Sequence, residues 1–140
     1  MSGNDFLTFA KTLHASDDEA ARRTSDSRAY YALYHQVRDY LVSAGIRVTT
    51  NPDEHERMIR FLKNSGVQDA KYIGEKMDEI RRKRNKADYE LKDLSFNKTT
   101  CSLYCDMTET LFNQLDSTDR QLLKNGLIQY AQRVNEPYNC

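Results

Sequence analysis

The chain has 140 residues, 30% charged and 39% hydrophobic, with only 5 glycines and 2 prolines, a composition that favours one compact helical domain over a β-sandwich or a disordered chain. The 21 basic and 21 acidic side chains cancel, so any attraction for nucleic acid must be local. No apolar run approaches the roughly 20 residues of a membrane helix, and residues 1–10 lack a secretory-signal pattern, so we expect a cytoplasmic protein with no membrane partner.

Two helices are predicted before Gly45. The first covers residues 5–15 with Asn4 as its cap, and four of its apolar side chains share one face: Phe6, Phe9, Ala10 and Leu13. The second begins at Ser16, which is followed three residues later by Glu19 in the pattern of a capping box, and it ends before Gly45. Because residues 24–26 have weak helix propensity, a break there is the alternative to one continuous helix.

The second predicted helix carries two neighbouring stripes of side chains. Its inward stripe consists of Ala29, Leu33, Val37 and Leu41. The adjoining stripe is polar and aromatic and consists of Arg28, Tyr31, His35, Arg38 and Asp39. Because the helical period splits neighbouring tyrosines between faces, we expect Tyr30 and Tyr34 to point inward and Tyr31 to lie at a site or dimer surface.

Four further helices are predicted. Residues 51–54, Asn-Pro-Asp-Glu, provide a cap, a first-turn proline and two acidic residues, and they predict a helix that continues through residue 63. A longer helix is predicted over residues 67–91, with an irregular start near Gly74. Thr99 or Thr100 caps a helix that ends at Leu115, and the last helix covers residues 119–134. The inward residues are expected to be Met58, Phe61, Leu62, Ile73, Met77, Ile80, Leu103, Met107, Thr110, Leu111, Leu122, Leu123, Leu127, Ile128 and Ala131.

These elements predict an all-α antiparallel bundle of five to six helices in a single domain over residues 1–140, with its core at about residues 5–115. Cys101 and Cys105 lie one helical turn apart, and Cys140 is near the end of the chain. Two soft ligands fall short of the usual four of a structural zinc site, so we interpret these residues as structural or surface thiols. No metal and no cofactor are predicted.

A basic segment lies in the helix predicted over residues 67–91. Five of the six residues 81–86 are lysine or arginine, and Arg81, Arg84 and Asp88 recur on one stripe. Cations near a helix C-terminus complement the helix dipole, so a solvated basic face explains the run without a ligand. The alternative is a contact with RNA, for which an ion pair between Arg84 and Asp88 would hold the guanidinium in place for a phosphate.

Two segments together resemble the HEPN family, the small helical domains named for higher eukaryotes and prokaryotes nucleotide-binding. One is Arg-Ala-Tyr-Tyr-Ala-Leu-Tyr-His at residues 28–35, and the other is Arg-Asn-Lys-Ala-Asp-Tyr at residues 84–89. The likeness spans roughly residues 6–115. It implies an antiparallel helical bundle, often a homodimer, and a biology of RNA targeting, toxin–antitoxin pairs or phage defence.

The resemblance also implies a chemistry. Active members of the family carry Arg, four to six residues and then His, and they cut RNA without metal by letting the ribose 2′-hydroxyl attack the adjacent phosphate. Here Tyr89 stands in the place of the histidine, and a phenol that titrates near pH 10 is a poor general base at neutral pH. His35 is the candidate replacement; its other reading is a structural bond to Asp88 or Tyr89.

The sequence leaves three hypotheses. The first is an RNA-targeting HEPN protein of a toxin–antitoxin or phage-defence system, acting as a metal-independent endoribonuclease. The second is a noncatalytic HEPN module that binds RNA or a nucleotide, or a nucleotidyltransferase-type or other antitoxin partner. The third is an unrelated helical adaptor. The predicted catalytic residues are Arg84, Asp88, Tyr89 and His35, and the predicted RNA or nucleotide contacts are Arg28, Arg81, Asn85 and Tyr31.

Overall fold

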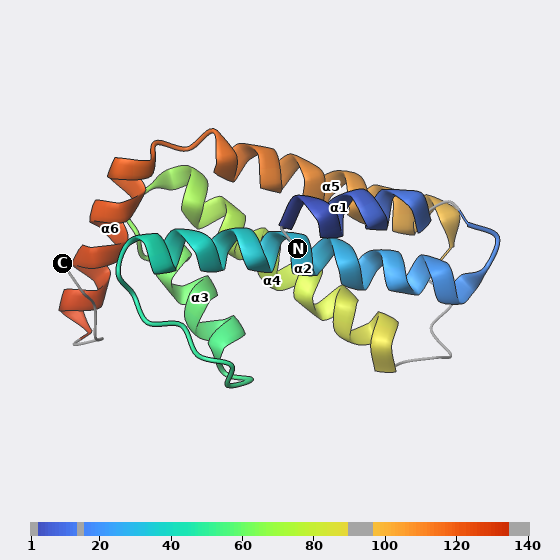
Figure 1. The fold of residues 1–140 in the computed structure, drawn as a ribbon, viewed down its shortest axis with the longest axis horizontal. Helices are drawn as coiled ribbons and strands as arrows, with labels where there is room; N and C mark the ends of the chain where they lie inside the picture. The colour runs from blue at the N-terminus through green and yellow to red at the C-terminus, as the bar shows by residue number, and fades with distance from the viewer. Residues whose placement is uncertain (1–2, 14–15, 90–96, 135–140) are drawn as a thin grey trace. The chain divides into compact units, whose positions relative to one another are not determined.

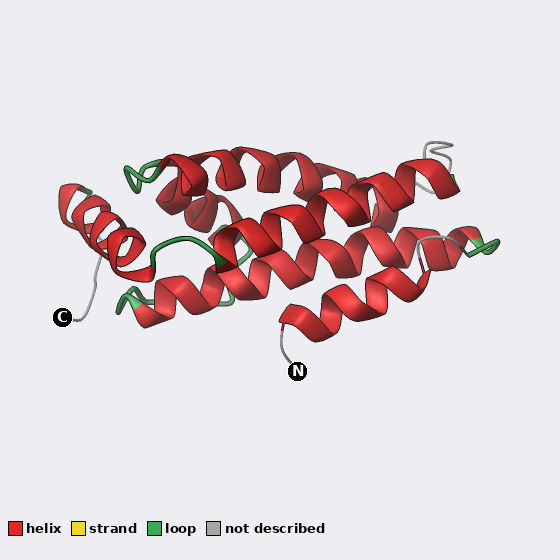
Figure 2. Cartoon of the chain, turned by 90° about the horizontal axis from the view of Figure 1, so that it is seen from above, coloured by secondary structure: helices red, strands yellow, loops and turns green. Residues whose placement is uncertain are grey.

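The computed structural model describes residues 3–13, 16–89 and 97–134, and for Asn4 and residues 86–89 it describes the backbone alone. These residues form six helices and no β-strand (Figure 1, Figure 2), so the predicted all-α class is confirmed. None of the described helices is both long enough and apolar enough to cross a membrane. The helices are α1 (Gly3–Leu13), α2 (Glu19–Ser43), α3 (Glu54–Lys63), α4 (Gln68–Tyr89), α5 (Lys98–Asp116) and α6 (Arg120–Arg133).

The chain divides into two compact units. Unit 1 comprises residues 1–35 and 79–113, and unit 2 comprises residues 36–78 and 114–140. The boundaries fall within α2, α4 and α5, so each of these helices contributes one part to each unit. Only α1 belongs wholly to unit 1, whereas α3 and α6 belong wholly to unit 2.

In unit 1, α1 is tied to α2 and α5 by polar contacts. Ser25 Oγ donates a hydrogen bond of 2.9 Å to the carbonyl oxygen of Ala10, and Lys11 Nζ lies 2.7 Å from a carboxylate oxygen of Glu109. Around these contacts the core combines small side chains such as alanine and cysteine with the larger Tyr30 and several leucines. The buried apolar residues of unit 1 are Leu7, Ala10, Ala29, Tyr30, Ala32, Leu33, Ile80, Cys101, Cys105 and Leu111.

In unit 2, larger side chains fill the core. The Tyr40 hydroxyl of α2 donates a 2.9 Å hydrogen bond to the Leu115 carbonyl oxygen of α5, and the rings of Phe61 and Tyr130 meet edge to face at 4.9 Å between α3 and α6. The inward residues predicted for α3 and for this part of α2 and α4 are confirmed as buried. They include Val37, Leu41, Met58, Phe61, Leu62, Ile73 and Met77.

The helix starts differ from two predictions. Asp18 Oδ1 accepts a hydrogen bond from the Ala20 amide, so the start of α2 is capped by this carboxylate rather than by Ser16, which accepts from the Asp18 amide instead. At α5, Asn97 Oδ1 accepts from the Thr100 amide, and the prediction of a threonine cap was wrong. The last helix, α6, is capped by Asp119, whose Oδ1 accepts a hydrogen bond from the Leu122 amide.

The alternative of a break in α2 is also wrong, since the helix is continuous from residue 19 to residue 43. Hydroxyl groups in the weak segment bond to carbonyl oxygens and so do not disrupt the helix. Thr24 Oγ1 donates to Ala20 of the preceding turn, and Ser25 Oγ donates to Ala10 of α1. Tertiary packing therefore outweighs the weak local propensity of this segment.

Three large apolar residues that were predicted to face inward are exposed. Phe9, Leu103 and Leu122 expose 49%, 67% and 58% of their surface, and the predicted inward residue Thr110 is exposed as well. On α5 the buried face is made by Cys101, Cys105 and Thr108 in its first half and by Leu111, as predicted, and Leu115 in its second half. Apolar bulk alone was therefore a poor guide to the register of these helices.

Two glycines sit inside helices for reasons of packing. At Gly74 a Cβ would lie 3.0–3.2 Å from atoms of Lys63, Leu62 and Ile59, so α4 passes close to α3 there, and the predicted irregular helix start was wrong. At Gly126 a Cβ would overlap the carbonyl oxygen of Ser65. Gly126 therefore lets its backbone approach that of Ser65 more closely than a residue with a Cβ permits, whereas Gly74 relieves a tight contact with α3.

We expect the substitution Gly126→Ala to lower the free energy of unfolding by about 1–3 kcal/mol, because the new methyl group overpacks against the Ser65 backbone. At a helix position with free space around it, the same substitution raises the free energy of unfolding by about 1 kcal/mol. The sign of the change therefore reports whether the Ser65 backbone lies close to residue 126. Urea unfolding followed by circular dichroism measures the effect. The control is Lys124→Ala on an exposed position of α6, expected within about 0.5 kcal/mol of wild type. Equal or greater stability of Gly126→Ala would contradict the packing.

Candidate functional site in unit 1

The candidate site is centred on Arg84, where α4 meets α2 within unit 1. Arg84 Nη2 donates a 2.7 Å hydrogen bond to the Tyr31 hydroxyl, and Nη1 donates to Asn85 Oδ1 at 3.2 Å. The guanidinium carbon also lies 4.9 Å from the centroid of the Tyr31 ring, within the range of a cation–π contact. The half-buried guanidinium is thus fixed in one orientation by two side chains that were both predicted to belong to the site.

An aromatic cluster extends the site along α2 to α1. The His35 ring stacks on Phe6 with a centroid distance of 5.0 Å and an interplanar angle of 19°. The rings of His35 and Tyr34 are nearly perpendicular, with an interplanar angle of 83° and a centroid distance of 5.4 Å. The centroid of the Tyr31 ring lies 6.3 Å from that of the imidazole. Tyr31 therefore neighbours both the guanidinium of Arg84 and the imidazole of His35, which gathers the two predicted groups into one cluster.

The other two predicted arginines lie at the edges of this cluster. Arg28 is exposed, and its guanidinium carbon lies 5.8 Å from the Phe6 ring centroid. Burial raises the pKa of the Tyr30 phenol well above its ordinary value, and the positive charges of Arg81 and Arg84 oppose that rise. Arg81 and Arg84 therefore lie near Tyr30, which is fully buried as predicted.

Six of the eight predicted site residues are thus described with their side chains: Arg28, Tyr31, His35, Arg81, Arg84 and Asn85. The side chains of Asp88 and Tyr89 lie outside the described residues. The predicted bond from His35 to one of these residues consequently stays a prediction. The same holds for the expected ion pair between Arg84 and Asp88.

Sequence reasoning missed the burial of charged side chains in unit 1, among them Asp26 and Lys83. Asp26 on α2 exposes 2% of its surface, and Lys83 on α4 exposes 7%. Asp26 Oδ2 accepts a long hydrogen bond of 3.7 Å from the Cys101 thiol, and Lys83 Nζ lies 5.3 Å from the Tyr104 ring centroid. Burial raises the pKa of Asp26 to about 7, against the opposing influence of Lys83, Cys101 and Arg23.

A signal for both residues was present in the helical spacing. Lys83 follows Ile80 by three residues and so continues the buried stripe of α4. Asp26 precedes Ala29 by three residues and Leu33 by seven, which places it on the buried stripe of α2. Charged residues in phase with an apolar stripe are buried more often than composition suggests, and they need a partner there.

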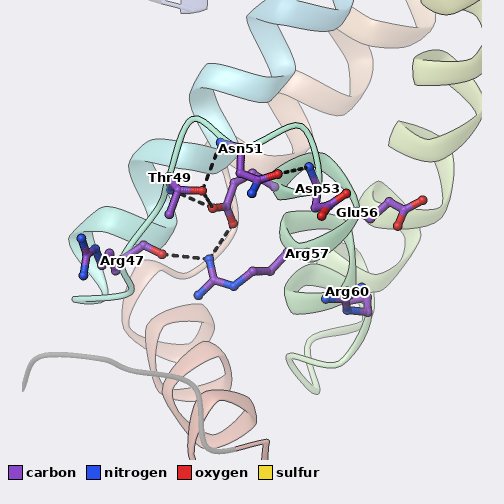
Figure 3. A pocket seen from close by; sticks show the side chains of 8 residues that line it. Arg47, Thr49, Asn51, Asp53, Glu56, Arg57 and Arg60 are labelled. Atoms are coloured by element: carbon purple, nitrogen blue, oxygen red, sulfur yellow. Dashed lines mark hydrogen bonds and ion pairs between the residues drawn. The ribbon is translucent and has the colours of Figure 1, made fainter.

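A hollow with polar walls lies in unit 2, where the loop before α3 meets that helix (Figure 3). Its buried carboxylate, Glu54, accepts from the Thr49 amide at 2.7 Å, from the Thr49 hydroxyl at 2.6 Å and from Arg57 Nη1 at 2.6 Å. Burial acts to raise the pKa of Glu54, but these hydrogen bonds outweigh it and lower the pKa. Arg47 and Arg60 do not converge on one point (Figure 3). We therefore interpret the hydrogen bonds of Glu54 as contacts that hold the loop against α3.

We expect the stability of the protein to fall as the pH rises from about 4 to 7. The pKa of Asp26 is raised to about 7 in the folded state, so this carboxyl group binds its proton more tightly there than in the unfolded chain. Its contribution to stability is therefore complete below the unfolded pKa of 3.8 and is lost above about pH 7. Asp26→Asn should remove this dependence, so its stability relative to wild type should grow by up to about 1.4 kcal/mol per pH unit over that interval.

Urea unfolding at pH 4 to 8 measures this difference. Asp106→Asn is the matched control, because it removes an exposed carboxylate from α5 and should leave the wild-type dependence in place. A pH dependence in Asp26→Asn equal to that of wild type would show that the buried carboxyl does not titrate in this range.

The site unites residues from the two segments that carry the resemblance described above, since Tyr31 lies in residues 28–35 and Arg84 begins residues 84–89. Its chemistry is that of a fixed cation beside aromatic rings and an imidazole. The HEPN likeness rests on the two motifs themselves. The chain matches no protein-family model, no curated protein and no solved structure.

Proposed function

We propose that this chain is a HEPN-family RNA-targeting protein of a toxin–antitoxin or phage-defence system that binds RNA at the site around Arg84. The observation that carries the proposal is the Arg84 guanidinium held between Tyr31 and Asn85. A guanidinium presents parallel N–H donors that match the oxygens of a phosphate. Because its orientation is already fixed, binding a phosphate costs less conformational entropy than with a mobile side chain.

The aromatic cluster supports single-stranded RNA as the ligand. Single-stranded RNA is recognised through bases that stack on aromatic rings and on guanidinium planes. Phe6 and His35 form a stacked pair next to Arg28, and Tyr31 lies between this pair and Arg84. A chain with balanced charge has no long-range pull on nucleic acid, so binding depends on this local combination of rings and cations.

In the catalytic form of the proposal, the site cleaves RNA without a metal. His35 accepts the proton of the ribose 2′-hydroxyl, whose oxygen attacks the adjacent phosphorus and forms a 2′,3′-cyclic phosphate. The bond from phosphorus to the 5′-oxygen of the next nucleotide breaks, and that oxygen takes up a proton from water and leaves as a hydroxyl group. Arg84 stabilises the negative charge that builds up on the phosphate oxygens. The family resemblance adds a homodimer in which two such sites share one cleft.

A noncatalytic form is favoured by a specific feature of the sequence, the tyrosine at position 89 where active relatives carry histidine. The stacking of His35 on Phe6 also supports this form, since stacking holds the imidazole as part of an aromatic wall. In this form the same residues bind RNA or a nucleotide, or dock a nucleotidyltransferase-type partner, without cleavage.

We expect Arg84→Ala to weaken the binding of a single-stranded oligoribonucleotide by about tenfold or more, because a charge-assisted phosphate contact is worth at least about 1.4 kcal/mol. Fluorescence anisotropy with a labelled oligonucleotide at fixed ionic strength measures the dissociation constant. The control is Lys71→Ala, which removes an exposed cation from α4 in unit 2 and should leave the affinity near that of wild type. Equal affinities for wild type and Arg84→Ala would remove the assignment.

His35→Phe separates the two forms of the proposal. The phenyl ring keeps the stack on Phe6 and removes the group that moves protons. In the catalytic form, this variant binds RNA like wild type and loses at least about a hundredfold in cleavage, the typical contribution of a general acid or base. The assay follows a labelled RNA on a gel with a metal chelator present. Binding without cleavage by the wild-type protein would select the noncatalytic form.

A further inference from the structure

Phe6 of α1 was expected only as an apolar side chain of the first helix, but its half-buried ring contacts three of the residues assigned to the site. The His35 imidazole stacks on it, with ring centroids 5.0 Å apart and an interplanar angle of 19°. The Tyr31 ring centroid lies 6.2 Å from that of Phe6, and the Arg28 guanidinium carbon lies 5.8 Å from it. Phe6 therefore links three site residues that lie on successive turns of α2.

The helix that carries Phe6 is fixed against the first half of α2 at two points (Figure 1, Figure 2). At one point Ser25 Oγ donates its buried 2.9 Å hydrogen bond to the Ala10 carbonyl oxygen. At the other, a Cβ on Gly3 would lie 2.7 Å from the Ala32 carbonyl oxygen, so only glycine permits this approach of the two backbones. Positions 3, 6 and 10 are spaced by three and four residues and share one face of α1. Phe6 is thus directed at α2 from between two fixed contacts.

A stacked contact constrains the plane of an imidazole and leaves its nitrogen atoms out of the contact. Both ring nitrogens form their hydrogen bonds within the plane of the ring, whereas the stack with Phe6 uses the face of the ring. His35 can turn its ring out of this plane only by breaking the stack. The stack consequently sets the directions in which the two nitrogens of His35 point.

We propose that Phe6 is a positioning residue for His35, fixing the imidazole plane beside the Tyr31–Arg84 pair, and that Gly3 allows α1 to hold Phe6 there. The consequence for RNA rests on the proposed function. In the catalytic form, His35 becomes positively charged when it accepts the 2′-hydroxyl proton, and the electron-rich face of Phe6 attracts that charge. In the noncatalytic form, Phe6 holds the imidazole as a flat surface for a base.

Nuclear magnetic resonance of the free protein tests the positioning without RNA. Phe6→Leu removes the aromatic face and keeps an apolar side chain, so ¹³C relaxation should show a more mobile His35 ring than in wild type. The control is Phe9→Leu, the same substitution on the same helix at a side chain that is 49% exposed. It should leave the His35 ring as rigid as in wild type. An imidazole that stays equally rigid in Phe6→Leu would overturn the positioning role.

Gly3→Ala tests the same contact while leaving Phe6 in the chain. The new methyl group meets the Ala32 backbone and pushes α1 away from α2. The nuclear Overhauser contacts between the Phe6 and His35 rings should weaken, and the His35 ring should become more mobile. Urea unfolding identifies a temperature at which every variant is folded for these comparisons. Unchanged contacts and mobility would show that Gly3 has no part in the positioning.

The functional consequence is measured with the labelled single-stranded oligoribonucleotide. In the catalytic form, Phe6→Leu and Gly3→Ala should each lower kcat about tenfold or more with KM nearly unchanged, because a small displacement of a reacting group slows the chemical step. In the noncatalytic form, Phe6→Leu should weaken binding about two- to tenfold, the range expected for one aromatic pair. Phe6→Tyr keeps the aromatic face and should restore either property to near the wild-type value.

The proposal and the proposed function fail in distinguishable ways. If wild-type protein neither binds nor cleaves RNA, the proposed function is wrong, whereas the resonance measurements still decide whether Phe6 positions His35. If wild type acts on RNA and Phe6→Leu matches it in kcat and affinity, the positioning role is wrong and the proposed function stands. A raised KM at unchanged kcat in Phe6→Leu would identify Phe6 as a direct RNA contact and would also overturn the positioning role.

Discussion

The hydrogen bond from Arg84 to the Tyr31 hydroxyl joins two segments that lie 53 residues apart in the sequence. Around it the aromatic rings of α1 and α2 assemble, and Asp26 and Lys83 are buried in the same unit. A hydrogen bond to a charged group is worth about 1.5–3 kcal/mol, but its larger effect is geometric. It gives a long and flexible side chain a single direction, which a recognition site for a phosphate requires.

The buried carboxyl group of Asp26 lowers the stability of the folded chain when it is ionised. An ionised carboxylate in the interior of unit 1 is unfavourable, as the raised pKa of Asp26 shows. Withdrawing a carboxylate from water costs several kcal/mol even where an opposite charge lies nearby. A chain selected for stability alone would therefore have an apolar residue at position 26.

The all-α class and the faces of α2, α3 and α4 could be predicted from sequence, because apolar residues recur there with the helical period and the buried side chains are large. The faces of α5 and α6 could be predicted in part, since Leu111, Leu123, Leu127 and Ala131 are buried as expected whereas Leu103, Thr110 and Leu122 are exposed. Cys105, Thr108 and Gly126 pack closely through their small size, and small size gives no hydrophobic signal. Arg84, Tyr31 and His35 could be selected from motifs. Their contacts with Phe6, and the burial of Lys83, depend on tertiary packing between helices that local sequence does not encode.

The buried thiols of α5 have a chemical consequence. Burial, reinforced by the neighbouring negative charge of Asp26, raises the pKa of Cys101 to about 12, and burial raises the pKa of Cys105 to about 11. Nucleophilic attack and oxidation require the thiolate, which is scarce at such values. Peroxide or an alkylating reagent would therefore reach these two sulfur atoms only through transient opening of unit 1, so their rate of modification reports how often that part of the molecule opens.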